Sequence, residues 1–96
     1  MNKEELDYNI RVCASDLNVD EKYLRPIPKN TLVKDKEYIG NCRNSNKAVW
    51  KGDHFEYQRY KFGNYYTDKI NHYEDDDGYD VFVPVEVVYE AKNYNS

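Results

Sequence analysis

The chain has 96 residues and a mass of 11.5 kDa, which leaves room for one domain with one core. Its net charge of −4 and its pI of about 5.1 disfavour a dedicated nucleic-acid-binding protein, since such domains are usually basic. No apolar run approaches the roughly 20 residues that a bilayer-spanning helix needs, and the charged first residues lack the apolar core of a signal peptide. We therefore expect a single cytoplasmic domain over residues 1–96, with no membrane association.

Residues 1–30 predict a helical segment. Four apolar residues recur at spacings of four, three and four residues, as on one face of an amphipathic helix: Leu6, Ile10, Cys13 and Leu17. Asp20 can cap a second helix of one turn, and Pro26 and Pro28 then impose an extended connector. Because the cytoplasm is reducing, we expect no disulfide between Cys13 and Cys42.

Residues 31–96 predict a β-sheet. Apolar residues alternate with a period of two, and turn residues interrupt them at 44–46, 51–53 and 63–64. The expected strands are 36–42, 47–51, 54–61, 64–70 and 80–89. Short strands preceded by a helix predict an α+β fold, in which the helix packs on a five-stranded antiparallel meander or a small SH3-like barrel.

The last predicted strand contains a proline. Val81, Val83 and Val85 share one face, and Phe82 and Pro84 share the other. Because proline has no N–H to donate to a ladder, we expect strand 80–89 to lie at a sheet edge or to bulge at this residue. An open edge can pair between protomers, so a homo-oligomer formed through this strand stays an alternative.

Charge is divided unevenly along the chain. Residues 31–63 carry a net charge of +3, whereas residues 64–96 hold two basic and eight acidic side chains, a net of −6. Residues 73–80, here called the acidic segment, hold the candidate partner-binding residues Tyr73, Glu74, Asp75, Asp76, Asp77, Tyr79 and Asp80. Adjacent carboxylates repel one another, so the segment is solvated, bound to a cation or placed against a basic partner.

The cation alternative can be compared with a known pattern. An EF-hand loop needs an acidic residue or Asn at its first position and a Glu at its twelfth. Counting back from Gly78 puts Tyr73 at the first position and Pro84 at the twelfth, so an EF-hand is rejected. A looser Ca²⁺ or Mg²⁺ site and a merely solvated loop stay open, and we assign no metal and no cofactor.

A second set of residues mixes positive charge with aromatic rings. Its members, the alternative ligand-binding residues, are Arg43, Trp50, Tyr57, Arg59 and Lys61. The basic side chains can hold a phosphate while an aromatic ring stacks on a base, which predicts a small nucleotide-like ligand. Trp50 is also suited to anchor the core, and one face of strand 54–61 must be buried.

The sequence gives little support for a catalytic site or a zinc site. Cys42 needs His54 or His72 close by to act as a nucleophile, and a cysteine among apolar strands is usually a core residue. The two cysteines and two histidines of the chain form no closely spaced pairs of the kind that zinc sites show. We therefore expect a protein that is not an enzyme.

Several short motifs lie between residues 38 and 84. They are Gly40-Asn41-Cys42-Arg43-Asn44, Ala48-Val49-Trp50-Lys51-Gly52, Lys61-Phe62-Gly63, Ile70-Asn71-His72 and the run from Glu74 to Pro84. In these motifs the chain resembles a group of small uncharacterised proteins of phages and mobile elements, for which no activity is established. Small acidic phage proteins often bind host proteins, and some inhibit host defence, as anti-CRISPR proteins do. The resemblance implies an accessory protein whose acidic segment binds a basic surface on a host protein.

Overall fold

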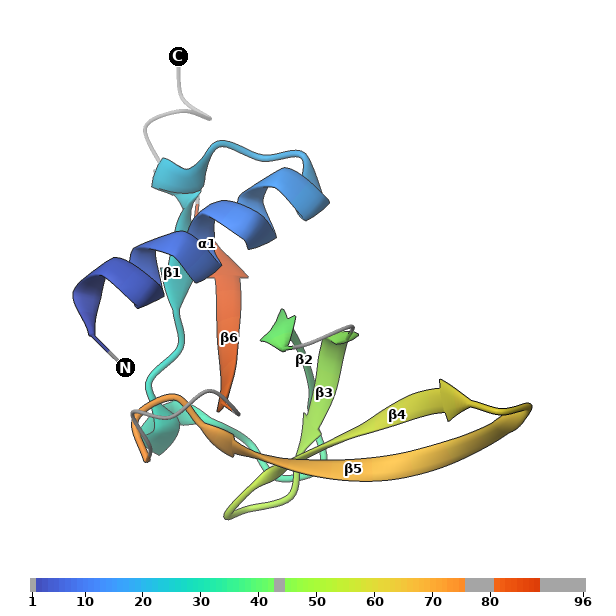
Figure 1. Cartoon of the computed structure of the whole chain (residues 1–96). Coiled ribbons are helices and arrows are strands. Elements are labelled where there is room, and N and C mark those ends of the chain that lie inside the picture. Colours follow the sequence, from blue (N-terminus) through green and yellow to red (C-terminus); the bar gives the residue numbers. More distant parts are fainter. Residues whose placement is uncertain (1, 43–44, 76–80, 89–96) are drawn as a thin grey trace.

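The computed structural model describes residues 2–42, 45–75 and 81–88 and has the predicted α+β architecture (Figure 1). The helices are α1 (Lys3–Leu17) and two short 3₁₀ helices, η1 (Glu21–Tyr23) and η2 (Lys29–Thr31). The strands are β1 (Leu24–Pro26), β2 (Glu37–Cys42), β3 (Ser45–Trp50), β4 (Phe55–Lys61), β5 (Asn64–His72) and β6 (Val81–Val87).

Helix α1 is capped at both ends by asparagine. The Asn2 side chain accepts a hydrogen bond from the Glu5 N–H at 2.8 Å and so satisfies an amide of the first turn. Asn18 ends the helix in the left-handed conformation, with φ of 57°. The predicted apolar face packs against β1 and β6 through Leu6, Ile10, Cys13 and Leu17.

Strands β2 to β6 close into a small barrel. The pairs β2–β3, β3–β4 and β4–β5 are antiparallel, as the predicted meander requires. β6 then returns to pair antiparallel with β2, where Ile39 lies opposite Val85, and parallel with β5, where His72 lies opposite Phe82. Helix α1 lies across β1 and β6 (Figure 1).

The connector after η1 forms a strand that the sequence did not predict. β1 pairs antiparallel with Val85–Val87 of β6, so the described sheet has six strands rather than five. Asp20 caps η1 as predicted, because its carboxylate accepts from the Lys22 N–H at 3.1 Å. A strand of three residues is too short to display a period of two, although the extended conformation imposed by Pro26 is compatible with it.

β6 is an interior strand, so the expectation that strand 80–89 lies at an edge is wrong. β2 flanks β6 on one side, while β5 and then β1 flank it on the other. Pro84 falls between the stretch paired with β5 and the stretch paired with β1, and its carbonyl accepts from the Ile27 N–H at 2.8 Å. Because both sides of β6 are occupied, its described residues present no open edge for strand pairing between protomers.

The core consists of two apolar clusters on the two faces of β6. The barrel interior is filled by Tyr38, Cys42, Ala48, Trp50, Phe55, Tyr57, Ile70 and Phe82. On the other face, Val83 and Val85 pack with Cys13, Ala14 and Leu24 beneath α1. The alternation predicted for the last strand is thus confirmed, and both of its faces are buried from Val81 to Val85.

Two turns differ in position from the prediction. Ser45 pairs with Cys42, so β3 begins inside the turn expected at 44–46. The turn between β4 and β5 is Phe62-Gly63, one residue earlier than expected, and both residues have positive φ, 53° and 80°.

The close approach of β6 to β2 requires glycine at position 40. A Cβ on Gly40 would overlap the Val83 carbonyl oxygen and lie 2.6 Å from Phe82 Cζ.

Candidate functional site

The described part of the acidic segment is its beginning, residues 73–75, directly after β5. The other predicted residues, Asp76, Asp77, Tyr79 and Asp80, lie outside the described residues. Backbone hydrogen bonds fix this beginning to the barrel: Tyr73 N–H donates to the Phe82 carbonyl at 3.1 Å, and Asp75 N–H to the His72 carbonyl at 2.9 Å. The carboxylates of Glu74 and Asp75 therefore leave the sheet at a defined place.

Both of these carboxylates contact Lys29 of η2. Glu74 Oε2 accepts from the Lys29 backbone N–H at 2.9 Å, and Asp75 Oδ1 lies 2.6 Å from Lys29 Nζ. The side chains of Lys29 and Asp75 are 38% and 30% exposed. A solvent-accessible ion pair of this kind contributes roughly 0–1 kcal/mol, so a cationic partner can replace Lys29 at little cost.

A hollow of about 760 Å³ lies beside Glu74. It is lined by Pro28, Lys29, Asn30, Leu32, Trp50, Gly52 and Glu74. Pro28 and Leu32 contribute apolar surface, and Glu74 contributes negative charge. That combination suits a lysine or arginine side chain, which has an apolar stem and a charged end.

Tyr73 is less accessible than a partner-binding residue would be. Its side chain is half-buried and packs against the apolar cluster beneath α1, and its ring centroid lies 4.3 Å from that of His72. Burial, with a smaller effect of the Glu74 charge, raises the pKa of its phenol. Tyr73 therefore serves first to anchor the acidic segment on the protein.

His72, which sequence reasoning treated as a possible catalytic base, is a structural residue. The side chain is fully buried; its Nε2 lies 3.0 Å from the Ile27 carbonyl oxygen, and its Nδ1 accepts from the Glu74 N–H at 3.0 Å. These partners require a proton on Nε2 and none on Nδ1, which is the neutral imidazole. Burial lowers the pKa of His72, and the Ile27 carbonyl and the nearby carboxylates oppose this effect only in part.

The bond to Ile27 compensates for the proline in β6. In an antiparallel pair, two hydrogen-bonded residues exchange both of their N–H to O=C bonds. Ile27 donates to the Pro84 carbonyl, but Pro84 has no N–H with which to return the bond. The His72 imidazole supplies this missing donor and so satisfies the Ile27 carbonyl.

The structure does not bring the alternative ligand-binding residues together. Trp50 and Tyr57 are each 4% exposed because they fill the barrel interior, so neither ring is open for stacking on a base. Arg59 Nε lies 3.2 Å from Asp68 Oδ2, and Lys61 lies at the far end of β4. Arg43 is outside the described residues. The burial of Trp50 confirms its expected role as a core anchor.

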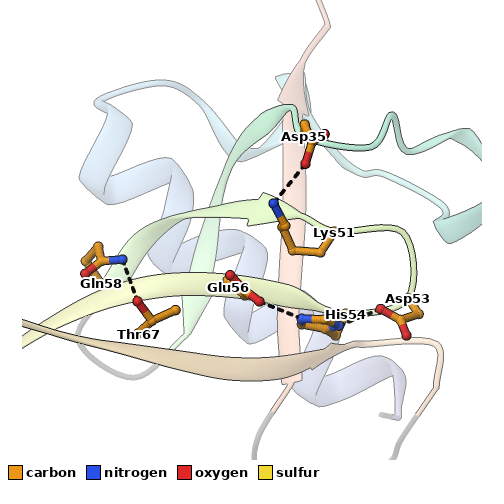
Figure 2. Close-up of polar contacts among 7 residues, drawn as sticks. All are labelled: Asp35, Lys51, Asp53, His54, Glu56, Gln58 and Thr67. Atoms are coloured by element: carbon orange, nitrogen blue, oxygen red, sulfur yellow. Dashed lines mark hydrogen bonds and ion pairs between the residues drawn. The ribbon is translucent and has the colours of Figure 1, made fainter.

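A polar network that the sequence reasoning missed lies at the turn between β3 and β4 (Figure 2). His54 Nδ1 lies 2.5 Å from Asp53 Oδ1, and His54 Nε2 lies 3.0 Å from Glu56 Oε2. The bond to Glu56, followed by that to Asp53, raises the pKa of His54, since two carboxylates favour the imidazolium. Nearby, Lys51 Nζ lies 2.9 Å from Asp35 Oδ1. Each of these charged groups has a partner of opposite charge within the network, as expected of ion pairs that stabilise a turn.

Both cysteines are buried, in different clusters. Burial, followed by the charge of Asp16, raises the pKa of Cys13 to about 11. Cys42 belongs to the barrel interior, in agreement with a core role. Within residues 2–42, 45–75 and 81–88, no group of three or more His, Cys, Asp and Glu side chains is arranged to hold a metal ion. No helix in this part of the chain has the length and apolar character needed to cross a membrane.

Comparison with known proteins leaves the family open. No protein-family model matches the chain, and no curated protein or solved structure is similar enough to match it. The resemblance of residues 38–84 to phage and mobile-element proteins therefore stays a prediction.

Proposed function

We propose that the protein is a non-enzymatic binding module whose acidic segment engages a basic surface on a host protein. The observation that carries this proposal is the position of Glu74 and Asp75, which hydrogen bonds hold beside a hollow lined in part by apolar residues. A lysine or arginine of the partner can place its stem against Pro28 and Leu32 and bond with its charged end to Glu74.

Charge supports the same proposal at longer range. Residues 64–96 carry a net charge of −6, and a field of this sign speeds the encounter with a basic surface. Asp76, Asp77 and Asp80 add to that field, and Tyr79 is the aromatic residue of the segment proposed to supply contact area. Lys29 then has a defined role: its backbone N–H holds Glu74, and its ammonium group neutralises Asp75 until a cation of the partner replaces that ammonium group.

We place the protein in the cytoplasm of a host cell as the product of a phage or mobile element. The proposed outcome of binding is inhibition of a host defence, in the manner of anti-CRISPR proteins. This part of the proposal rests on the resemblance of residues 38–84 and on the behaviour of small acidic phage proteins as a class.

Affinity capture from host-cell lysate with two charge-matched variants tests the proposal. One variant replaces Asp75–Asp77 by Asn, and its control replaces the exposed α1 residues Glu4, Asp7 and Asp16 by Gln, Asn and Asn. Both changes remove three negative charges, so non-specific electrostatic effects are equal. We expect the wild type and the α1 variant to retain one stoichiometric partner at low salt and the Asp75–Asp77 variant to lose it.

Two results would contradict the proposal. Equal capture by both variants would exclude the acidic segment as the binding site. A wild-type protein that enriches no partner at low or moderate salt would contradict the binding function itself.

A further inference from the structure

The β4–β5 hairpin leaves the barrel as a two-stranded ribbon (Figure 1). β4 and β5 pair as far as Lys61 opposite Asn64, at the tip. Among the described residues, β3 pairs with β4 only at Val49 and Trp50. Beyond Glu56, β3 and β4 do not pair with each other, and a hollow of about 320 Å³ lies against both of these strands. The outer part of β4 thus has a strand on one side and a hollow on the other.

The register of the hairpin identifies the backbone groups on the unpaired side. Lys61 and Asn64 flank a two-residue turn, so these two residues hydrogen-bond to each other through their backbones. Counting from the turn toward the barrel, every second residue pair of the hairpin is hydrogen-bonded in the same way. The N–H and C=O groups of Gln58 and Tyr60 therefore point to the side of β4 on which Glu56 pairs with β3. In residues 2–42, 45–75 and 81–88, no strand pairs with β4 at these two positions, so β4 presents an open edge.

The facing part of β3 does not need a strand partner. Ser45 Oγ donates to the Lys47 carbonyl at 2.7 Å and accepts from the Lys47 N–H at 3.4 Å. One serine hydroxyl thus caps the backbone groups that continue the β3 ladder. The edge open to an added strand is consequently that of β4.

The ribbon also exposes aromatic rings that the core does not use. Tyr60, Phe62 and Tyr65 are 63%, 83% and 73% exposed, and the rings of Tyr60 and Tyr65 meet edge to face at 5.0 Å. Phe62 occupies a turn position with φ of 53°, a conformation that is costly for a bulky residue and usually taken by Asn or Gly. A strained and exposed aromatic residue is typical of a contact site rather than of a folding requirement.

Charge argues against the β4 strand of a second copy as the occupant. Arg59 and Lys61 alternate with Gln58 and Tyr60 along β4. Two β4 strands can pair antiparallel so that both Gln58 and Tyr60 of one copy face a residue whose backbone groups are unpaired in the other. In each such register, Arg59 of one copy lies opposite Arg59 or Lys61 of the other. Like charges directly opposite one another destabilise a strand pair, an effect that the contact of each Arg59 with Asp68 of its own hairpin lessens. A carboxylate opposite Arg59 or Lys61 stabilises the pair instead.

We propose that β4 binds an extended segment of a partner protein by strand addition, and that this segment alternates acidic with apolar residues. Its backbone pairs with Gln58 and Tyr60, while its apolar side chains contact the ring of Tyr60 on the same face. Its carboxylates lie beside Arg59 and Lys61 on the opposite face. This surface is separate from the acidic segment and selects a partner segment of the opposite charge.

Nuclear magnetic resonance with a designed peptide tests the proposal. The probe is an octapeptide of alternating Val and Glu, and its control has Lys in place of Glu. At saturation with the Val/Glu peptide, we expect hydrogen exchange of the Gln58 and Tyr60 amides to slow at least tenfold. The Val/Lys peptide should bind at least tenfold more weakly. The amides of Tyr65 and Thr67, on the outer edge of β5, serve as the internal reference and should not change.

A matched pair of variants isolates the backbone contribution. Gln58→Ala and Gln58→Pro both lose the side-chain bond to Thr67, but Gln58→Pro also loses the N–H that points to the open edge. We expect Gln58→Pro to bind the Val/Glu peptide roughly tenfold more weakly than Gln58→Ala, the loss of about one strand hydrogen bond. Equal affinities would overturn strand addition.

Three further outcomes would also overturn the proposal. Protection of Tyr65 and Thr67 in place of Gln58 and Tyr60 would assign binding to β5. Protection of Gln58 that increases with protein concentration, without peptide, would identify a second copy as the occupant. Absence of binding at millimolar Val/Glu peptide would exclude the proposed partner chemistry.

Discussion

Replacing His72 by Phe tests whether this side chain completes the sheet beside Pro84. The variant keeps an aromatic ring next to Trp50 and Phe55 but removes both ring nitrogens. The Ile27 carbonyl and the Glu74 N–H then each lose their bond to the imidazole. An unsatisfied buried polar group costs about 1–3 kcal/mol, and the Glu74 amide is the more accessible of the two. We therefore expect the free energy of unfolding to fall by about 2–4 kcal/mol.

Urea unfolding at pH 7.5, followed by the fluorescence of Trp50, measures this loss. Trp50 is the single tryptophan of the chain, and it lies in the barrel core beside His72. His72→Gln keeps an amide N–H near the position of Nε2 and should recover the bond to Ile27 in part. A decrease of less than about 0.5 kcal/mol for His72→Phe would refute the assignment of two required hydrogen bonds.

Pro84 supplies the second half of the test. Pro84→Val provides an N–H that can bond to the Ile27 carbonyl, as in an ordinary antiparallel pair. In the His72→Phe background we expect it to restore about 1 kcal/mol, whereas in the wild type the imidazole already occupies that carbonyl. Equal effects of Pro84→Val in the two backgrounds would mean no coupling and would refute the reasoning.

Three other changes have definite expected outcomes. Gly40→Ala should lower the free energy of unfolding by about 3 kcal/mol or more, because its Cβ overlaps β6; an unchanged urea midpoint would contradict the register. The carboxylates around His54 raise its pKa, so its stabilising effect is complete below about pH 6.5 and lost as pH rises through the folded pKa. The stability difference between the wild type and His54→Asn should therefore shrink from pH 5.5 to 8.5, and a constant difference would exclude this effect. With its pKa at about 11 and its side chain buried, native Cys13 should react with a disulfide reagent at pH 8 at least about a hundredfold more slowly than after unfolding, as mass spectrometry can measure.

The elements that the sequence predicted are those with a local signal. The spacing from Leu6 to Leu17 defines one helical face, and the alternation in Val81–Val85 defines the last strand. β1 was missed because a strand of three residues carries too little periodicity. The sequence left a meander and a small barrel open, because the pairing of β6 with β5 that closes the barrel depends on contacts between distant residues. Pro84 was expected at an edge or a bulge for a sound local reason. The compensating donor, His72, lies on another strand and cannot be read from neighbouring residues.

The candidate site, like the fold, was predictable only where its signal is local in the sequence. The acidic segment was evident from composition, but the contacts of Glu74 and Asp75 with Lys29 join residues more than forty positions apart. The burial of Trp50 and Tyr57 was foreseeable as an alternative, since one face of each strand has to form the core. A closer reading of the sequence could have found the His54 network, because His54 and Glu56 are two residues apart and so share a strand face.

The two proposed surfaces are separated along β5, which has a functional consequence. Gln58 and Tyr60 lie opposite Thr67 and Tyr65, five and seven residue steps before His72, and such steps span roughly 16–23 Å. The surfaces also differ in charge, so a contact that suits one disfavours the other. Changes at distant sites without shared partners usually add, so Gln58→Pro should leave capture by the acidic segment unchanged. Loss of both activities in that variant would instead mean that one partner spans the molecule from the ribbon to Lys29.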